Sequence, residues 1–180
     1  MKVLLINPPF TNYGGLEGHG GKAPPINLGY LAATLREKKR YYGISILDAE
    51  VLGMTFEQIE DHIKREKPNI VGITSSTPAY ISAIRISKIC KEAVAGIKVI
   101  LGGIHPSAFP TETVSEETVD FVVMGEGEIT FLDLLNAIEK KGGYKDIPGI
   151  AYKDGGGVIR NKPRQLVDDL DTLPFPARDL

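Results

Sequence analysis

The sequence has very little cysteine: Cys90 is the only one among 180 residues. A single thiol excludes an internal disulfide framework, a zinc finger and any iron–sulfur site that takes three cysteines from this chain, and it suits a reducing compartment. No apolar run approaches the roughly 18 residues of a membrane span. The apolar start at Val3–Ile6 is too short for a signal peptide and is broken by Asn7-Pro8-Pro9. These absences predict a cytoplasmic protein without a membrane partner.

The sequence also lacks an excess of charge of either sign. It has 21 Lys and Arg against 23 Asp and Glu, a net charge of −2. This balance argues against a strongly basic nucleic-acid binder. With 42% apolar residues in 180, the chain has the length of one globular domain, or one with a small appendage.

Short Val- and Ile-rich runs alternate with helical patterns. Near-continuous apolar runs are typical of strands that are buried on both faces of a parallel sheet. The expected strands are Val3–Ile6, Ile44–Leu47, Ile70–Ile73, Val99–Leu101 and Phe121–Met124. The expected helices are Ile26–Lys39, one that starts after Thr55 with Gln58 completing a capping box, Ala79–Ala95, Ile129–Lys141, and a short one between Thr111 and Glu117. The alternation predicts an α/β, Rossmann-like (flavodoxin-like) fold, with a five-stranded parallel sheet and helices on both faces.

The pattern changes after residue 145. Residues 146–164 contain two short strand-like runs around Asp154–Gly157 and predict a C-terminal β-hairpin. Residues 165–180 lack periodicity and contain Pro174 and Pro176, as a linker does. We therefore expect a Rossmann-like domain at 1–145, a hairpin at 146–164, and a linker at 165–180 that leads into a further domain.

Small and hydroxylated residues gather where the expected strands end. In an open parallel sheet, ligands bind outside the carboxyl ends of the strands. The segments there are Asn7-Pro8-Pro9, Thr74-Ser75-Ser76-Thr77, Gly102-Gly103-Ile104-His105-Pro106-Ser107 and Gly125-Glu126-Gly127-Glu128. Each glycine pair can also be explained as a tight turn. Three such segments on one edge favour a groove that admits a bulky ligand.

Common nucleotide motifs are missing from these positions. No G-x-G-x-x-G joins the first strand to the first helix, and no Walker A sequence is present. Asn7 and Ser75 stand where a receiver domain has acidic residues. The spacing of Asp48, Glu50 and Gly53 imitates the cobalamin motif D-x-H-x-x-G, but it follows the second strand instead of the first, so we treat it as coincidence.

The ordered set of segments resembles one known family. Its members are cobalamin-dependent radical S-adenosylmethionine (SAM) enzymes, including methyltransferases and the anaerobic magnesium-protoporphyrin monomethyl ester cyclase, and the resemblance is to their N-terminal cobalamin-binding domain. It covers essentially all 180 residues and is carried by Asn7-Pro8-Pro9, Leu28-Gly29-Tyr30-Leu31-Ala32, Val71-Gly72-Ile73-Thr74, Gly102-Gly103-Ile104-His105-Pro106, Gly125-Glu126-Gly127-Glu128 and Leu173-Pro174-Phe175-Pro176-Ala177-Arg178.

This resemblance implies a cobalamin whose nucleotide tail is off the cobalt and enters the groove. It further implies that no protein histidine replaces the tail, and that a following barrel holds a [4Fe–4S] cluster and SAM for methyl transfer or oxidative cyclisation. This chain alone is then not catalytic and binds no metal ion directly. The expected cofactor-binding residues are Asn7, Pro8, Thr74, Ser75, Ser76, Thr77, Gly102, Gly103, His105, Pro106, Ser107, Gly125, Glu126 and Gly127.

Three alternatives stay open in the sequence. The chain could instead be a non-catalytic interaction module that has lost its ligand. Glu126 and Glu128 could favour a helix N-terminus, or they could contact the ligand or the barrel. His105 could be an ordinary loop residue or could face the ligand, and Pro106 after it predicts an extended backbone.

Overall fold

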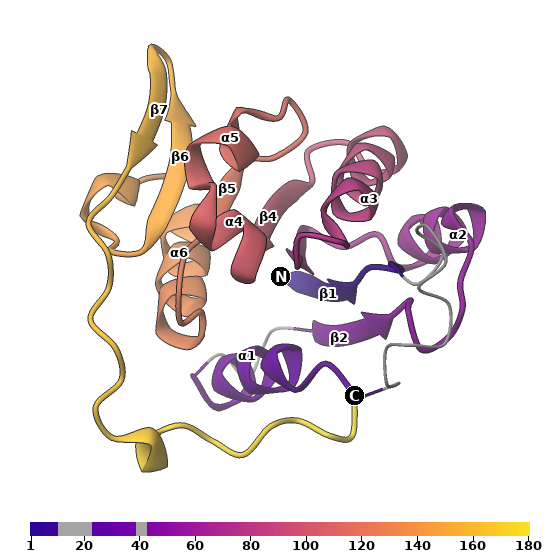
Figure 1. Ribbon diagram of the computed structural model, residues 1–180, viewed down its shortest axis with the longest axis horizontal. Helices are drawn as coiled ribbons and strands as arrows, with labels where there is room; N and C mark the ends of the chain where they lie inside the picture. The colour runs from indigo at the N-terminus through magenta and orange to yellow at the C-terminus, as the bar shows by residue number, and fades with distance from the viewer. Residues whose placement is uncertain (11–22, 39–42) are drawn as a thin grey trace.

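The computed structural model of the chain describes residues 1–10, 23–38 and 43–180. Strands and helices alternate along most of it (Figure 1). The strands are β1 (Lys2–Asn7), β2 (Gly43–Asp48), β3 (Ile70–Thr74), β4 (Lys98–Gly102), β5 (Phe121–Val123), β6 (Ile150–Asp154) and β7 (Gly157–Arg160). The helices are α1 (Ile26–Lys38), α2 (Phe56–Glu66), α3 (Tyr80–Ala93), α4 (Ile104–Ala108), α5 (Pro110–Ser115) and α6 (Glu128–Lys140), with short 3₁₀ turns at Tyr144–Asp146 and Leu170–Thr172.

The sheet has the order β2-β1-β3-β4-β5-β6-β7. Its first five strands are parallel, as the apolar runs predict. The chain moves outward from β1 to β2 and then crosses to β3 on the other side of β1, so the strand order reverses at β1 and β3. This is the flavodoxin-like order, in which ligands bind at the reversal point.

The expected hairpin is present but is not a separate appendage. Its first strand, β6, pairs antiparallel with β5, and β7 pairs with β6, so the sheet has seven strands where the sequence predicts five and a C-terminal β-hairpin. The hairpin joins the sheet because β5 would otherwise be an edge strand. A three-residue strand would leave its backbone groups unpaired there, and β6 satisfies them.

Two apolar layers enclose the sheet. Successive residues of β1 point to opposite faces, so Val3 and Leu5 pack under α1 and α6, while Leu4 and Ile6 pack under α2 and α3. All four side chains are fully buried. Cys90 of α3 is buried in the second layer, and burial raises the pKa of its thiol to about 12. Among the described residues, no helix is both long enough and apolar enough to cross a membrane.

The helices α1, α2, α3 and α6 begin within one residue of the start that local patterns predict. Thr55 caps α2: its hydroxyl accepts from Gln58 N at 3.3 Å and the Gln58 side chain accepts from Thr55 N at 2.9 Å, which confirms the capping box. Helix α3 ends at Ala93, two residues before the predicted boundary. The expected helix over Ile26–Lys39 is seen to Lys38, and Lys39 lies outside the described residues.

Helix α4 contradicts the prediction of extended backbone around Pro106. His105 is helical, and Pro106 occupies the first turn of α4. A proline is tolerated there because its missing N–H would have no partner within the helix. The hydrogen bond from His105 N to Ser75 O, at 3.1 Å, holds the preceding residue in place.

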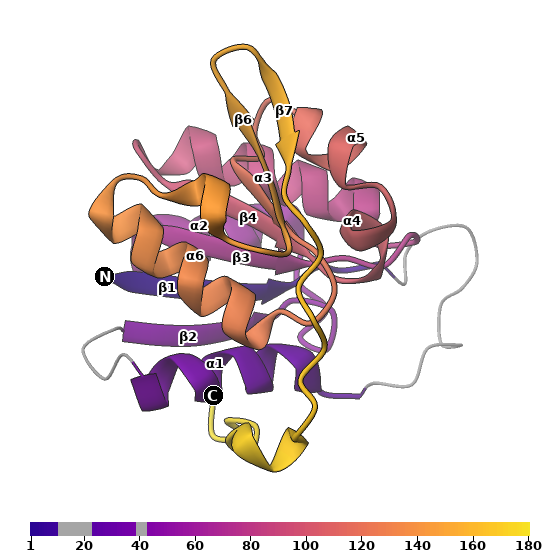
Figure 2. The same ribbon diagram turned by 90° about the vertical axis from the view of Figure 1, so that its left-hand side faces the viewer.

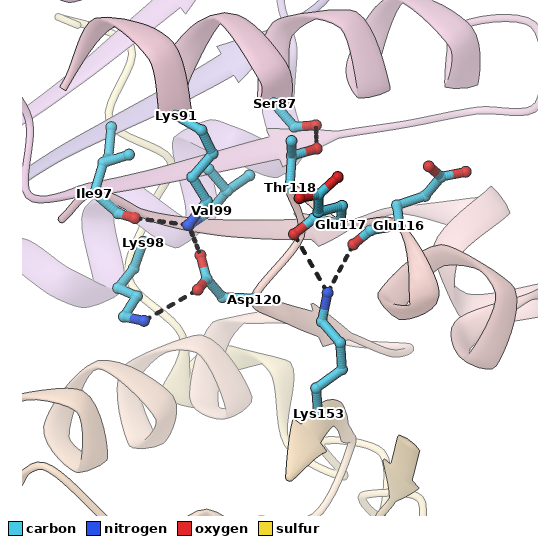
Figure 3. Close-up of polar contacts among 10 residues, drawn as sticks. All are labelled: Ser87, Lys91, Ile97, Lys98, Val99, Glu116, Glu117, Thr118, Asp120 and Lys153. Atoms are coloured by element: carbon cyan, nitrogen blue, oxygen red, sulfur yellow. Dashed lines mark hydrogen bonds and ion pairs between the residues drawn. The ribbon is translucent and has the colours of Figure 1, made fainter. Parts of the chain in front are cut away.

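The start of β5 is tied to β4 and α3 by one carboxylate (Figure 3). Asp120 accepts from Lys91 Nζ at 2.5 Å, from Lys98 Nζ at 3.0 Å and from Val99 N at 2.8 Å. Charge-assisted bonds of this kind are about twice as strong as neutral ones. Asp120 precedes β5 and Lys98 begins β4, so this cluster stabilises the edge of the sheet opposite to the strand carboxyl ends.

Residues 165–180 form a strap that lies along the domain (Figure 2). The strap descends from the hairpin past the start of α6 to α1. Val167 N donates to Glu126 Oε2 at 2.8 Å, and Ala177 N donates to Gly29 O at 3.0 Å. Arg36 of α1 makes two hydrogen bonds with Asp179, at 2.8 and 2.9 Å, which lower the pKa of that carboxyl. The segment is therefore a docked element, although its composition is that of a linker.

Replacing Gly29 by alanine should separate the docking of the strap from the stability of the domain. The added Cβ would lie 3.1 Å from Pro176 Cβ, so the strap must shift. Alanine favours a helix interior over glycine by about 1 kcal/mol. We therefore expect Gly29→Ala to hold or raise the melting temperature while hydrogen exchange at the Ala177 amide accelerates.

The matched control is Asp179→Asn, which weakens only the exposed ion pair with Arg36 and should leave Ala177 protected. Hydrogen exchange read by mass spectrometry measures both variants. Unchanged protection of Ala177 in Gly29→Ala would mean that the contact between Gly29 and Pro176 does not hold the strap.

Candidate cofactor site

A cavity of about 950 Å³ opens at the carboxyl ends of β1, β3, β4 and β5. It lies on the face of the sheet that α1 and α6 cover, at the point where the strand order reverses. This volume is in the range of small-molecule sites. The edge of the sheet that the sequence indicates is thus the edge where the cavity lies.

Most of the predicted residues line this cavity. Those that do are Asn7, Thr74, Ser75, Ser76, Gly102, Gly103, Ser107, Gly125, Glu126 and Gly127. Four others, Pro8, Thr77, His105 and Pro106, are near in sequence but are not among the lining residues.

Ser75 connects the end of β3 to the end of β4. Its N–H donates to Gly102 O at 2.8 Å, and its carbonyl accepts from His105 N at 3.1 Å. Its hydroxyl, almost fully buried, donates to Ser76 O at 3.0 Å. The main role visible for Ser75 is therefore to fix the mutual position of two loops at the rim.

Gly103 is required by this junction. Its φ is +97°, which L side chains rarely adopt, and a Cβ would lie 2.8 Å from Ser75 O and 2.9 Å from Ser75 N. The obstacle to a side chain at Gly103 is thus the neighbouring backbone and not the space of the cavity. Gly102 differs, because a Cβ there would meet only Val123, at 3.5 Å or more.

The hydroxyl of Ser107 joins the β4 and β5 loops across the rim. It donates to Gly103 O at 2.7 Å and accepts from Gly125 N at 2.9 Å. Since a hydroxyl has one proton and two lone pairs, Ser107 can offer a ligand only an acceptor. Asn27 of α1 donates to Thr74 Oγ1 at 2.9 Å and closes the rim on the other side.

His105 is turned toward the side of α3. Its ring lies 4.0 Å from the ring of Tyr80 and 5.1 Å from that of Phe109, between centroids, and Nδ1 is 3.3 Å from Thr77 Oγ1. Partial burial raises the pKa of the Tyr80 hydroxyl. Within the described chain, no group of three or more His, Cys, Asp or Glu is arranged to hold a metal ion.

Glu126 links the cavity to the strap. It lines the cavity, and its carboxylate accepts from Val167 N in the strap. Helix α6 begins at Glu128 behind Gly127 without a side-chain cap. Of the two carboxylates that the sequence places near this helix start, Glu126 bonds the strap and Glu128 lies in the first turn of the helix.

The deep part of the cavity was not predicted. Two residues before the strand ends, Leu5, Gly72 and Ile100 form one rung across β1, β3 and β4. Leu28 and Leu31 of α1 and Phe131 of α6 complete it. Gly72 was a usable signal, since an isolated glycine inside an apolar strand often marks close approach of another group.

The pair Gly102 and Gly103 gives a stability test. We expect Gly103→Ala to cost about 1–3 kcal/mol, because it forces a strained φ and a collision with backbone. Gly102→Ala should melt near the wild type, since its Cβ makes ordinary contacts. Thermal unfolding followed by circular dichroism measures both. Equal melting temperatures for the two variants would show that the junction between Gly103 and the Ser75 backbone can accept a side chain without loss of stability.

Comparison with known proteins gives a consistent result. The family model described as the B12 binding domain matches residues 17–135. An uncharacterized methyltransferase of Pyrococcus horikoshii is 38% identical over 100% of this chain, which spans 39% of that protein. The anaerobic magnesium-protoporphyrin IX monomethyl ester cyclase of Rubrivivax gelatinosus is 34% identical over 96% of this chain and 32% of its own length.

Solved structures share the fold. The cobalamin-dependent SAM radical enzyme OxsB with aqua-cobalamin bound has a TM-score of 0.80 at 23% identity, covering 99% of this chain and 24% of that one. The radical SAM methyltransferase TsrM from Kitasatospora setae, with cobalamin and a [4Fe–4S] cluster bound, has a TM-score of 0.73 at 22% identity over 97% of this chain and 31% of that one. The chain therefore corresponds to less than two fifths of each of these proteins.

Proposed function

The chain belongs to the B12-binding domain family, and from this premise we propose that it binds cobalamin in the described cavity, as one part of a longer cobalamin-dependent radical SAM enzyme. The observation that carries the proposal is the cavity at the carboxyl ends of β1 and β3, within the span that the family model matches. The similarity to the methyltransferase and the cyclase supports methyl transfer or cyclisation as the reaction of the longer protein.

The residues present fit this cofactor in two respects. Glycines at Gly102 and Gly125 leave the side of the cavity open where side chains would otherwise fill it. The lining changes from apolar in depth to polar at the rim, which suits a nucleotide tail with a flat base at one end and a ribose phosphate at the other. When bound, cobalamin supplies a cobalt ion that can carry a methyl group or an electron.

The chain's own residues have a binding and positioning role. The backbone of Gly102 would let the tail approach β4 closely, because no side chain stands between them. Ser76 and Ser107 lie at the rim, where hydroxyls can bond the polar atoms of the tail. Ile104, which is 78% exposed at the start of α4, offers an apolar surface at the mouth for the corrin edge.

The [4Fe–4S] cluster and SAM would bind outside this chain. Cys90 is buried and is the only cysteine of the sequence, so the [4Fe–4S] cluster and SAM would be held by the further domain. The exposed ring of Phe175 lies in the strap that would lead to it. We assign no catalytic residue to this chain.

The first test is a titration of the chain with hydroxocobalamin, with cobinamide, which lacks the nucleotide tail, as the matched ligand. We expect cobalamin to be retained on desalting with a tail-off spectrum, and cobinamide to bind at least tenfold more weakly, since it forgoes the contacts in the cavity. Gly102→Leu, which fills the space beside Val123, should reduce the binding of cobalamin but change that of cobinamide little. Failure of the chain to retain cobalamin at tens of micromolar ligand would refute the proposal.

A second prediction concerns the cobalt face that lies against the domain. His105 is engaged with Tyr80, Phe109 and Thr77, and it does not line the cavity. We therefore expect electron paramagnetic resonance of the cob(II)alamin complex to show no superhyperfine splitting from a protein nitrogen. The spectrum of His105→Ala should be the same. A nitrogen splitting that disappears in His105→Ala would assign this histidine to the cobalt.

A further inference from the structure

The lower part of the cavity contains carbon surface and little else. Its residues are Leu5, Gly72 and Ile100 on the sheet and Leu28, Leu31 and Phe131 on the helices. By the strand register, Leu5, Gly72 and Ile100 lie two residues before Asn7, Thr74 and Gly102, which is about 7 Å along the strands. We call these six residues the floor of the cavity.

Polar side chains of the cavity stay at the rim. Seven of them stand at or directly beside strand ends or helix starts: Asn7, Asn27, Thr74, Ser75, Ser76, Glu126 and Glu128. The eighth, Ser107, lies in the short helix α4 that follows β4. Several of them are bonded to the protein: Asn7 Nδ2 donates to Asp48 at 2.9 Å, and Asn27 Nδ2 donates to Thr74 at 2.9 Å. Among the described lining residues, none places a polar side chain on the floor.

Backbone groups of the floor are also committed. Leu5, Gly72 and Ile100 belong to three adjacent strands whose N–H and C=O groups pair in the parallel ladder. A polar atom of a ligand that reaches the floor would therefore lose its water and gain no partner there, and such an atom binds unfavourably.

We propose that the chain selects among cobamides by the base at the end of their nucleotide tail, preferring benzimidazole and phenolic bases to purines. The inference rests on the proposed function, because it assumes that the tail enters this cavity. A benzimidazole has one unsubstituted ring nitrogen and an otherwise carbon surface. Adenine has several ring nitrogens and an amino group, and part of this polar edge would lie against the floor.

Gly72 lets the apolar side chains of the floor pack closely together. A Cβ at this position would lie 2.8 Å from Leu5 Cδ2 and 3.3 Å from Phe131 Cζ, so these two side chains occupy the place of the missing one. The floor at this point is therefore carbon surface from Leu5 and Phe131. A flat aromatic base is the part of a cobamide that suits such a surface.

The experiment compares the affinity of the chain for three complete cobamides by equilibrium dialysis, read from corrin absorbance. They are cobalamin, which has dimethylbenzimidazole as its base, adeninylcobamide and p-cresolylcobamide. We expect p-cresolylcobamide and cobalamin to bind best, and adeninylcobamide to bind more weakly than cobalamin by roughly tenfold or more.

The expected order of affinities distinguishes the effect of the floor from the effect of how easily each base detaches from cobalt. Adenine leaves the cobalt more readily than dimethylbenzimidazole, and a phenolic base does not coordinate cobalt at all. If ease of detachment controlled affinity, adeninylcobamide would bind more tightly than cobalamin. That result, or equal binding of the two, would overturn the inference and leave the proposed function standing. Failure of all three cobamides to bind would overturn both.

A variant tests whether the floor causes the preference for cobalamin over adeninylcobamide. Leu31 lines the cavity and is partly buried, so Leu31→Gln places an amide beside the base at a helical position. We expect this change to narrow the preference for cobalamin over adeninylcobamide severalfold. Leu132→Gln is the matched control: Leu132 is a partly buried leucine against the same core that does not line the cavity, and its variant should keep the wild-type ratio.

An unchanged ratio in a folded Leu31→Gln would contradict the assignment of selectivity to the floor. Circular dichroism establishes that each variant is folded. The comparison of the three cobamides on the unmodified chain does not depend on either variant.

Discussion

The candidate site depends on the contact between Gly72 and Phe131. Gly72 lies in β3, in the interior of the sheet, where a strand normally presents Val or Ile to the helix above it. Without a side chain there, Phe131 of α6 closes to within 3.3 Å of the position that a Cβ would take. Leu5 and Phe131, which occupy the place of the missing side chain, both belong to the floor of the cavity. One missing side chain thus sets how closely α6 packs on the sheet beneath the cavity.

The two edges of the sheet have different roles. At the amino ends of β4 and β5, Asp120 holds two lysines and a backbone N–H, and Lys153 of β6 donates to Glu116 O at 2.8 Å (Figure 3). At the carboxyl ends, glycines and short hydroxylated side chains replace such charged clusters. The rim groups are bonded mainly to neighbouring loops, as at Ser75 and Ser107. The separation lets the amino ends of the strands stabilise the fold through charged clusters while small residues at the carboxyl ends leave room for the cavity.

Local sequence patterns predicted the strands and most helices, but they did not predict the contacts between these elements. Apolar runs at Val3–Ile6 and Ile70–Ile73 are long and uninterrupted, so the parallel strands and their common edge followed from the sequence. The capping box at Thr55 and Gln58 is also local, and it is confirmed. Helix α4 was missed because Pro106 argues against helix at His105, while the bond from His105 N to Ser75 O is a contact across 30 residues. The floor was missed for the same reason: Leu28, Leu31 and Phe131 follow ordinary helical periodicity, and only their packing over Gly72 makes them part of the site.

The strap shows how a segment of linker composition can acquire a fixed position. Its sequence has no periodicity, and Leu166, Leu170 and Phe175 remain largely exposed, so it gains little from burying side chains. Backbone bonds hold it at two points: Val167 N on Glu126 and Ala177 N on Gly29 O. Both points adjoin the cavity, since Glu126 lines it and Gly29 lies beside Leu28 on α1. The strap is therefore bonded to the same two segments that line one side of the cavity, α1 and the loop before α6. A change in the position of α1 or of the loop before α6 must move the cavity and the strap together.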